Sequence, residues 1–410
     1  MATRRAILQS VAGGMALAGS GALAALARAD LPRGTLASEL REALSGKRAL
    51  IKRSFRPPNY ETPVDMFDET ITANDRFFVR WHLSTIPVID AASWRLTVGG
   101  DAAEHGFELT MEGLRRDFEP VELVAVCQCA GNRRGYSEPH VPGVQWGSGA
   151  MGNARWKGAR LKDILARAGL KSEAVEIAFN GRDRGPLDAT PPFEKSLPAW
   201  KAMDENTLVA YEMNGAPLPH WNGFPARLVV PGWTATYWMK QIVSIRALPH
   251  PLASFWMTAA YRIPKGKFPV IDRFISQESE TTTPITEILV NSLITGAGGA
   301  PAAGGARFAV DSPIAVRGMA WDAGYGVRRV EVSLDAGRTW EEAALGDNLG
   351  RYSFRPWVYT FTPRSAGRVS VMARASNAQG TTQPSELIFD GPGYHNNVIQ
   401  TLPIDVSRGA

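Results

Sequence analysis

The chain has 410 residues, 44% of them hydrophobic, and a formal net charge of +5. This length predicts two domains, each able to bury a core of its own. Basic and acidic residues are interleaved and form no Lys/Arg tract, so nothing supports nucleic-acid binding, whereas the mild positive charge suits an anionic substrate or an acidic protein partner.

The N-terminus has the form of an export signal. Arg4 and Arg5 precede a weakly apolar, Gly/Ala-rich stretch, and Ala27-Arg28-Ala29 fits a cleavage site. The apolar stretch is short for a transmembrane anchor. We therefore interpret residues 1–29 as a twin-arginine (Tat) signal peptide. No later run is long and apolar enough to cross a bilayer, so we expect a soluble periplasmic protein with no membrane span.

Residues 30–283 mix strands, turns and short helices, which is typical of a mixed α/β domain. The stretches 93–100 and 225–232 have strand patterns, and 121–129 is extended with its odd-numbered positions on one face. The segment 158–170 predicts a helix that buries Leu161, Ile164 and Leu165 and ends at Gly169. No G-x-G-x-x-G motif is present, which argues against a dinucleotide-binding fold.

After residue 284 the pattern changes to short alternating strands. The stretches 328–340 and 367–380 alternate apolar and polar residues and are bounded by Gly-containing turns. The Gly/Ala-rich run 296–306 is interpreted as a loop within this second domain. We therefore predict an α+β chain, in which residues 30–283 form the mixed domain and residues 284–410 form an Ig-like β-sandwich.

The only two cysteines, Cys127 and Cys129, lie one residue apart on the extended segment. A disulfide between them would have strained geometry on a strand. The six histidines lack zinc-site spacing, and no C-x-x-C-H motif is present to attach haem. Two interpretations remain open from these residues alone: a reactive thiol whose pKa is lowered by the arginines that follow, or two inert core residues.

Five motifs resemble the sulfite oxidase family of molybdopterin enzymes, in consistent order from about residue 76 to the C-terminus. They are FFVRWH (77–82), CAGNRRG (129–135), WGSGAMGNARWKGARLKDIL (146–165), AYEMNGAPLPHWNGFPARLVVPG (210–232) and RGMAWDAGYGVRRVEVSLDAGRTW (317–340). The chain looks most like the bacterial periplasmic sulfite dehydrogenases. A secreted Ig-like adhesion protein, the interpretation from another functional class, would explain the sandwich but not the cysteine motif.

The resemblance implies a molybdenum–molybdopterin cofactor with Cys129 as the single protein ligand to the metal, for which a soft thiolate is suited. Cys127 matches no ligand position. The matching sulfite-site residues are Arg80 and Arg134, whose fixed charges would attract the anion. Tyr261 matches a hydroxyl donor of the active site, and Trp146 matches a wall of the substrate pocket.

The resemblance also implies the residues that hold the pterin and its phosphate. These are His82, Asp183, Asn222, Arg227, Trp238 and Lys240. Two positions depart from the family pattern. Asn222 stands where many animal members have His, and the segment 389–397 has no counterpart of an animal sulfite-site arginine.

The implied activity is oxidation of sulfite to sulfate. The chain has no haem-attachment motif and too few cysteines for an iron–sulfur cluster, so we expect electrons to pass singly to a c-type cytochrome. We also expect a homodimer or a heterodimer. Two alternatives within the family are a dehydrogenase of protein-bound sulfane sulfur and a methionine-sulfoxide reductase, although the latter typically lacks the sandwich.

Overall fold

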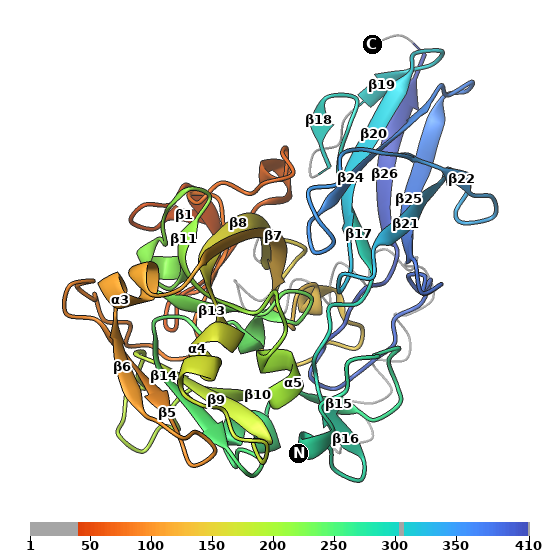
Figure 1. Cartoon of the computed structure of the whole chain (residues 1–410). Coiled ribbons are helices and arrows are strands. Elements are labelled where there is room, and N and C mark those ends of the chain that lie inside the picture. The colour runs from red at the N-terminus through yellow and green to blue at the C-terminus, as the bar shows by residue number, and fades with distance from the viewer. Residues whose placement is uncertain (1–39, 303–306, 409–410) are drawn as a thin grey trace, which may run out of the picture. The chain divides into compact units, whose positions relative to one another are not determined.

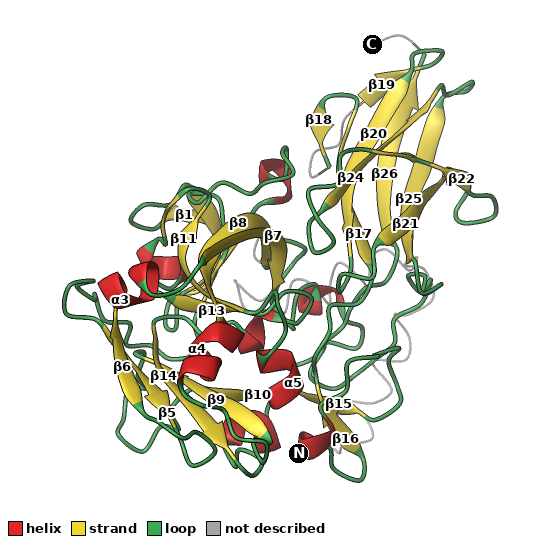
Figure 2. Cartoon of the chain, viewed as in Figure 1, coloured by secondary structure: helices red, strands yellow, loops and turns green. Residues whose placement is uncertain are grey.

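The computed structural model describes residues 40–302 and 307–408. The predicted signal peptide, residues 1–29, lies outside the described residues. Strands are the main regular elements of the described chain, long loops connect them, and the helices are short (Figure 2). The helices are α3 (Met111–Arg116), α4 (Leu161–Arg167), α5 (Ala199–Ala202) and α6 (Phe255–Thr258). No helix in this part of the chain has the length and hydropathy needed to cross a lipid bilayer.

The first part of the chain contains four sheets (Figure 1). Their strands, in spatial order, are β1 (Arg41–Ala43), β2 (Ala49–Ser54), β3 (Asn59–Glu61) and β4 (Val79–Arg80); β10 (Glu194–Pro198), β9 (Glu176–Gly181), β14 (Ile242–Leu248), β5 (Arg95–Gly99) and β6 (Phe107–Thr110); β12 (Ala216–Pro217), β11 (Leu208–Met213), β8 (Met151–Arg160) and β7 (Pro120–Gln128); and β15 (Arg262–Pro264) with β16 (Thr282–Pro284). A further strand, β13 (Arg227–Val229), pairs with β11.

Helix α4 confirms the periodicity argument for the middle of the predicted segment 158–170, whose first three residues belong to strand β8. Its buried side chains are Leu161, Ile164 and Leu165. Gly169 has a φ of 66°, which favours glycine, and its N–H donates to the Ala166 carbonyl while Leu170 N–H donates to the Leu165 carbonyl. This is a Schellman end, and it satisfies carbonyls that the last turn leaves free.

The long antiparallel pair β7–β8 carries the cysteine segment into the interior. β7 is partly exposed at its start and buried from Val124 onward. Its register places Cys127 opposite Gly152 and Gln128 opposite Met151. The strand is therefore partly exposed where it begins. Its buried end places Cys127 in the core, and Cys129 follows directly after it.

The second part of the chain is a sandwich of two five-stranded sheets, as predicted. One sheet has the order β18 (Ala300–Pro301), β17 (Asn291–Ala297), β20 (Ile314–Trp321), β24 (Arg355–Phe361) and β23 (Ala344–Leu345); the other has β19 (Arg307–Ala309), β26 (Gln400–Ser407), β25 (Gly367–Asn377), β21 (Val327–Ser333) and β22 (Glu341–Glu342). The alternating residues Val330, Val332, Val371 and Ala373 are buried in its core.

The sandwich is hydrogen-bonded to strand β7. Val126 N–H donates to the Tyr352 carbonyl at 2.9 Å, and Trp321 Nε1 donates to Gln128 Oε1 at 2.6 Å. A small apolar cluster that includes Val126, Trp321 and Phe354 lies around these bonds. The strand that leads to Cys129 is thus supported by both parts of the chain.

Candidate active site

The cysteine segment leaves β7 in a tight turn. Cys129 N–H donates to the Ala150 carbonyl at 2.9 Å, and Asn132 N–H donates to the Cys129 carbonyl at 3.0 Å. Asn132 Oδ1 accepts from Ala150 N–H at 3.0 Å, which ties the turn to the start of β8. Arg133 then adopts a left-handed φ of 68° and the chain enters a 3₁₀ turn, η2 (Arg134–Tyr136). Both cysteines are buried and neither is in a disulfide.

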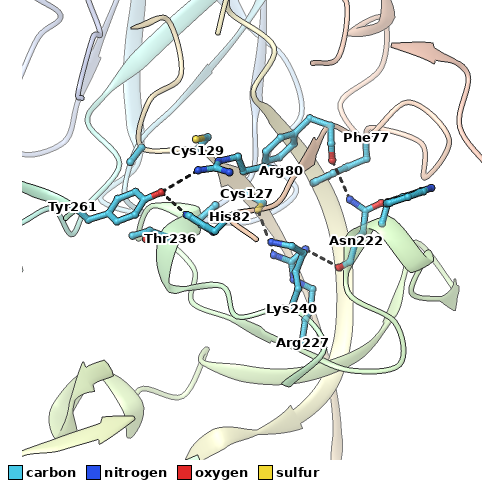
Figure 3. A pocket seen from close by; sticks show the side chains of 14 residues that line it. Phe77, Arg80, His82, Cys127, Cys129, Asn222, Arg227, Thr236, Lys240 and Tyr261 are labelled. Carbon is cyan, nitrogen blue, oxygen red and sulfur yellow. Dashed lines mark hydrogen bonds between the residues drawn. The ribbon is translucent and has the colours of Figure 1, made fainter. Parts of the chain in front are cut away.

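A cavity opens at this turn (Figure 3). It encloses about 440 Å³ of space, its mouth included. Seven of the eleven predicted site residues line it: Arg80, His82, Cys129, Asn222, Arg227, Lys240 and Tyr261. They come from strands, turns and loops far apart in the sequence, and the fold brings them together. Cys127 lines the cavity as well, although the resemblance gave it no role.

At the Cys129 end, three side chains form a hydrogen-bonded group. Arg80 Nη2 donates to the Tyr261 hydroxyl oxygen at 3.4 Å, and the same hydroxyl contacts His82 Nε2 (Figure 3). Tyr261 has a φ of 59°, a strained value for a bulky residue, which is a feature often found at functional sites.

The electrostatics of this group favour one protonation state for each member. Burial lowers the pKa of His82 well below its usual value, and the charges of Arg80 and Lys240 lower it further. Burial raises the pKa of Tyr261, against the attraction of Arg80. Burial alone would lower the pKa of Arg80, but Tyr261 and Cys129 raise it overall. The site therefore holds a neutral imidazole, a neutral phenol and a fixed positive charge near pH 7.

The opposite end of the cavity is basic, and the buried Asp183, which attracts Lys240, is hydrogen-bonded to neither of its cations. Arg227 donates to the carbonyls of Asn222 at 3.0 Å and Trp238 at 3.2 Å, and to Cys127 Sγ at 3.8 Å. Its Nε is buried without a partner. Burial lowers the pKa of Lys240 to about 7. Within residues 40–302 and 307–408, no carboxylate is hydrogen-bonded or ion-paired to either cation.

This donor set fits the expected cofactor. A buried cation is stable only when an anion compensates it, and two unpaired cations with one free N–H are suited to a phosphate and a polar ring system. The thiol of Cys129 lies at the other end of the same cavity. Cys129 would hold molybdenum, and Arg227 and Lys240 would hold the phosphate of molybdopterin. Asn222 faces the cavity, but its side chain is already bonded to Lys47 Nζ and the Phe78 carbonyl.

Four predicted site residues lie outside the cavity lining. The Arg134 side chain donates to the carbonyls of Val144 and Pro392, and its charge acts on Tyr261. Trp146 is fully buried, and its Nε1 has no partner among the described residues. Trp238 packs edge-to-face on Trp156 behind Arg227. Asp183 is buried, which raises its pKa, and it is attracted by Lys240.

Sequence reasoning missed four residues that touch the site. Phe193 stacks on His82 with ring centres 3.7 Å apart, and Lys195 Nζ lies 5.2 Å from the centre of the Tyr261 ring. Tyr394 stacks on Tyr261, and Lys47 is bonded to Asn222. These four residues belong to no motif that indicates a functional site. A single aromatic residue or lysine in a strand or loop is usually a packing or surface residue.

Comparisons with known proteins agree with this arrangement. The model of the oxidoreductase molybdopterin-binding domain matches residues 82–256, and that of the Mo-co oxidoreductase dimerisation domain matches residues 282–406. The sulfite oxidase of Gallus gallus is 34% identical over 82% of this chain and 72% of the relative. The mitochondrial sulfite oxidase of Homo sapiens is 34% identical over 88% of this chain and 66% of the relative.

The chain thus spans about two thirds of the length of the human relative. Among solved structures, the sulfane dehydrogenase SoxCD from Paracoccus pantotrophus is similar with a TM-score of 0.73 and 25% identity, over 95% of this chain and 93% of that chain. The matched domains make this chain an oxidoreductase with molybdenum and molybdopterin as its cofactor. From its two matched domains and its relatives, the chain belongs to the sulfite oxidase family of molybdopterin enzymes.

Proposed function

We propose that this protein oxidises sulfite to sulfate in the periplasm and passes the electrons one at a time to a c-type cytochrome. The observation that supports it best is the group formed by Arg80, Tyr261 and His82 beside Cys129, in a cavity whose far end carries unpaired cations. A small sulfur oxyanion needs a fixed positive charge and a hydroxyl donor at the metal end. An anionic cofactor needs the cations at the other end.

The roles of the protein groups follow from their geometry. Arg80 Nη1 is bonded to Asn59 Oδ1 and the Trp81 carbonyl, so Arg80 would bind a sulfite oxygen through the remaining N–H of Nη2, which leaves the sulfur lone pair free to point toward the metal side. The Tyr261 hydroxyl is held between Arg80 and His82, so its oxygen keeps one position during turnover. Neutral His82 adds no charge that would compete for the anion. When bound at Cys129, the cofactor supplies two-electron oxidation and oxygen transfer to sulfur.

A cytochrome acceptor is proposed because the sequence carries no second redox centre of its own: it has no C-x-x-C-H motif and only two cysteines. Without the predicted signal peptide, which contains the three cations Arg4, Arg5 and Arg28 and no acidic residue, the net charge falls by three, from +5 to +2, and this positive balance favours an acidic docking face on the acceptor. The matched dimerisation domain supports a dimer or a complex with a partner subunit.

A second candidate is oxidation of sulfane sulfur carried by a protein. It is favoured by the similarity to the sulfane dehydrogenase SoxCD, which extends over 95% of this chain. The two candidates share the cofactor and the electron acceptor. They differ in the size of the group that must reach Arg80 and Tyr261.

The test uses the purified, cofactor-loaded protein with cytochrome c as acceptor. Sulfite should support cytochrome reduction, whereas thiosulfate, a sulfane-sulfur probe, should not. Arg80→Gln should lower kcat/KM by about 10- to 100-fold, the value of one charge-assisted contact, with molybdenum content unchanged. Arg364→Gln, an exposed arginine paired with Asp311, serves as the control. Reduction by thiosulfate alone would favour the second candidate, and equal rates with oxygen alone would exclude the cytochrome.

A further inference from the structure

The loop between β25 and β26 of the sandwich reaches the candidate active site. Residues 392–394 of this loop pack on Arg134. Arg134 Nε donates to the Pro392 carbonyl at 2.8 Å, and its guanidinium carbon lies 5.3 Å from the centre of the Tyr394 ring. The neighbouring loop residue Asn396 donates from Nδ2 to the Arg133 carbonyl at 3.0 Å. The sandwich loop therefore contacts the Arg133 backbone and the Arg134 side chain.

Residues 390–394 of the loop are held together by hydrogen bonds of their own. Asp390 accepts two backbone N–H groups, from Gly393 to its carbonyl and from Tyr394 to its carboxylate, both at 3.0 Å. Gly393 has a φ of 64°, and a side chain there would meet Arg134 Cγ at 2.8 Å and Val141 Cγ2 at 2.6 Å. Only glycine allows the loop to approach Arg134 so closely.

The Tyr394 ring links Arg134 to the Tyr261 group. Tyr394 and Tyr261 are stacked with their centroids 5.6 Å apart and their planes 11° from parallel. Arg134 lies over Tyr394 and exerts an electrostatic effect on Tyr261. A ring that contacts both groups fixes their separation, because aromatic stacking and the cation–π contact each prefer a narrow range of geometries.

The contacts leave part of Arg134 available. Of its five N–H donors, Nε is bonded to Pro392 and Nη1 to the Val144 carbonyl, and Nη2 is bonded to no described residue. The two carbonyls orient the guanidinium, whose positive charge also attracts the Asp390 carboxylate. A positive group held in this way, over the ring that stacks on Tyr261, is suited to a small oxyanion.

We propose that residues 392–394 form one wall of the substrate site and that Tyr394 is a positioning residue, which holds Arg134 and Tyr261 at the spacing that a sulfur oxyanion requires. This inference rests on the proposed function, and it assigns a part of the substrate site to the sandwich domain. It predicts that disturbing the wall weakens anion binding more than it slows the chemical step.

The experiment compares four variants of the cofactor-loaded protein. Tyr394→Leu removes the ring, and Gly393→Ala forces the loop away from Arg134. Tyr394→Phe keeps the ring and should recover most of the loss seen in Tyr394→Leu. Gly391→Ala is the matched control, since a side chain at this exposed glycine meets nothing within 4 Å.

The readouts are molybdenum content, the Kd for sulfate by calorimetry, and the separate values of kcat and KM for sulfite. Tyr394→Leu and Gly393→Ala should each raise the sulfate Kd and the sulfite KM about tenfold, the loss of one charge-assisted contact, with kcat much less affected. Normal Kd and KM in both variants would overturn the proposal. So would a loss of molybdenum together with a lower thermal midpoint, because that pattern indicates a structural role.

The two proposals fail separately. If the wild-type protein binds sulfate but oxidises no sulfite, the proposed function is wrong, and the sulfate Kd values of the variants still decide the role of the wall. If the wild-type protein oxidises sulfite and the variants keep its KM and Kd, only the role of the wall is wrong.

Discussion

Cys127 and Cys129 share one face of the chain but have different surroundings. Cys127 lies within β7, opposite Gly152, and its thiol accepts from Arg227 at the basic end of the cavity. Cys129 lies after the strand, at the end that carries Arg80 and Tyr261. Burial raises the pKa of Cys127, so its thiol stays protonated. Cys129 has the spacing to Arg134 that the family's metal ligand has, and Cys127 matches no ligand position.

We therefore predict that Cys129→Ala loses molybdenum and Cys127→Ala retains it. Elemental analysis of the two purified variants measures this directly, and thermal unfolding checks that both are folded. Equal metal loss in the two variants would contradict the assignment of Cys129 as the ligand.

Lys240 makes the stability of the cofactor-free protein depend on pH. Burial lowers its pKa from 10.5 to about 7. Between these values the unfolded chain binds a proton that the folded chain lacks, so the free energy of unfolding rises as pH increases from about 7 to about 10. The penalty of the buried charge is fully present below pH 7. Each pH unit of this range contributes about 1.4 kcal/mol for one group.

Lys240→Met should reduce this pH dependence, by a few kcal/mol in all between about pH 7 and 10. Lys47, whose pKa burial also lowers to about 7, and Lys195, whose pKa burial lowers well below its usual value, should maintain the remainder. Urea unfolding at several pH values measures the slope in cofactor-free protein. If the free energy of unfolding of Lys240→Met depends on pH as steeply as that of the wild type, burial does not lower the pKa of Lys240.

At the scale of single elements, the pair β7–β8 sets the shape of the cavity. Gly152 of β8 lies opposite Cys127, and a side chain at Gly152 would meet the Phe77 ring at 2.5 Å. Phe77 lines the cavity and packs edge-to-face on Trp156. The absence of a side chain at Gly152 therefore leaves room for the Phe77 ring.

Gly152→Ala should displace Phe77 and destabilise the protein by about 1–3 kcal/mol, the usual cost of overpacking a core. It should also lower the molybdopterin content. Gly106→Ala is the control, because a side chain at that exposed glycine meets only a carbonyl at an ordinary 3.6 Å. If the urea midpoints of the two variants agree, the close approach of Phe77 does not constrain β8.

The elements that the sequence predicted share a strong local signal. Helix α4 has a 3.6-residue apolar period and a glycine at its end, and strands β5, β21 and β25 alternate clearly. Short-range patterns do not report long-range contacts. Arg80 and Tyr261 are 181 positions apart, so only the resemblance to a family could place them together. Tyr394 and Lys195 match no motif, and their contacts with Tyr261 depend entirely on the tertiary fold.

At the scale of the whole molecule, the predicted export signal remains a prediction, since residues 1–29 lie outside the described part of the chain. Replacing Arg4 and Arg5 with lysines should leave unprocessed protein in the cytoplasm, because the apolar stretch is too weak for the Sec route and the cofactor would need to be loaded before export. Fractionation and immunoblotting measure the two forms. Normal periplasmic processing of the Lys-Lys variant would exclude the Tat assignment.

The proposed docking of a cytochrome also belongs to this scale. An electrostatic encounter weakens as the Debye length falls from about 10 Å at 0.1 M salt to about 3 Å at 1 M. The rate of cytochrome reduction should therefore fall over this range, with the rate of sulfite-driven reduction of a small neutral dye as control. Equal salt dependence with both acceptors would place the effect on sulfite binding.

The main-chain bond between Val126 and Tyr352 limits how this protein can be recombined with its relatives. Chimeras usually treat a sandwich domain as a separable module, joined at a linker and free to be exchanged. In this protein the exchanged sandwich would include the Tyr352 carbonyl, which accepts a hydrogen bond from the strand that leads to Cys129. It would also include Pro392 and Tyr394, which contact Arg134. A graft made at residue 284 would therefore transfer part of the proposed substrate site with the sandwich. We expect relatives with different loops before β26 to differ in anion selectivity even when their first domains are identical.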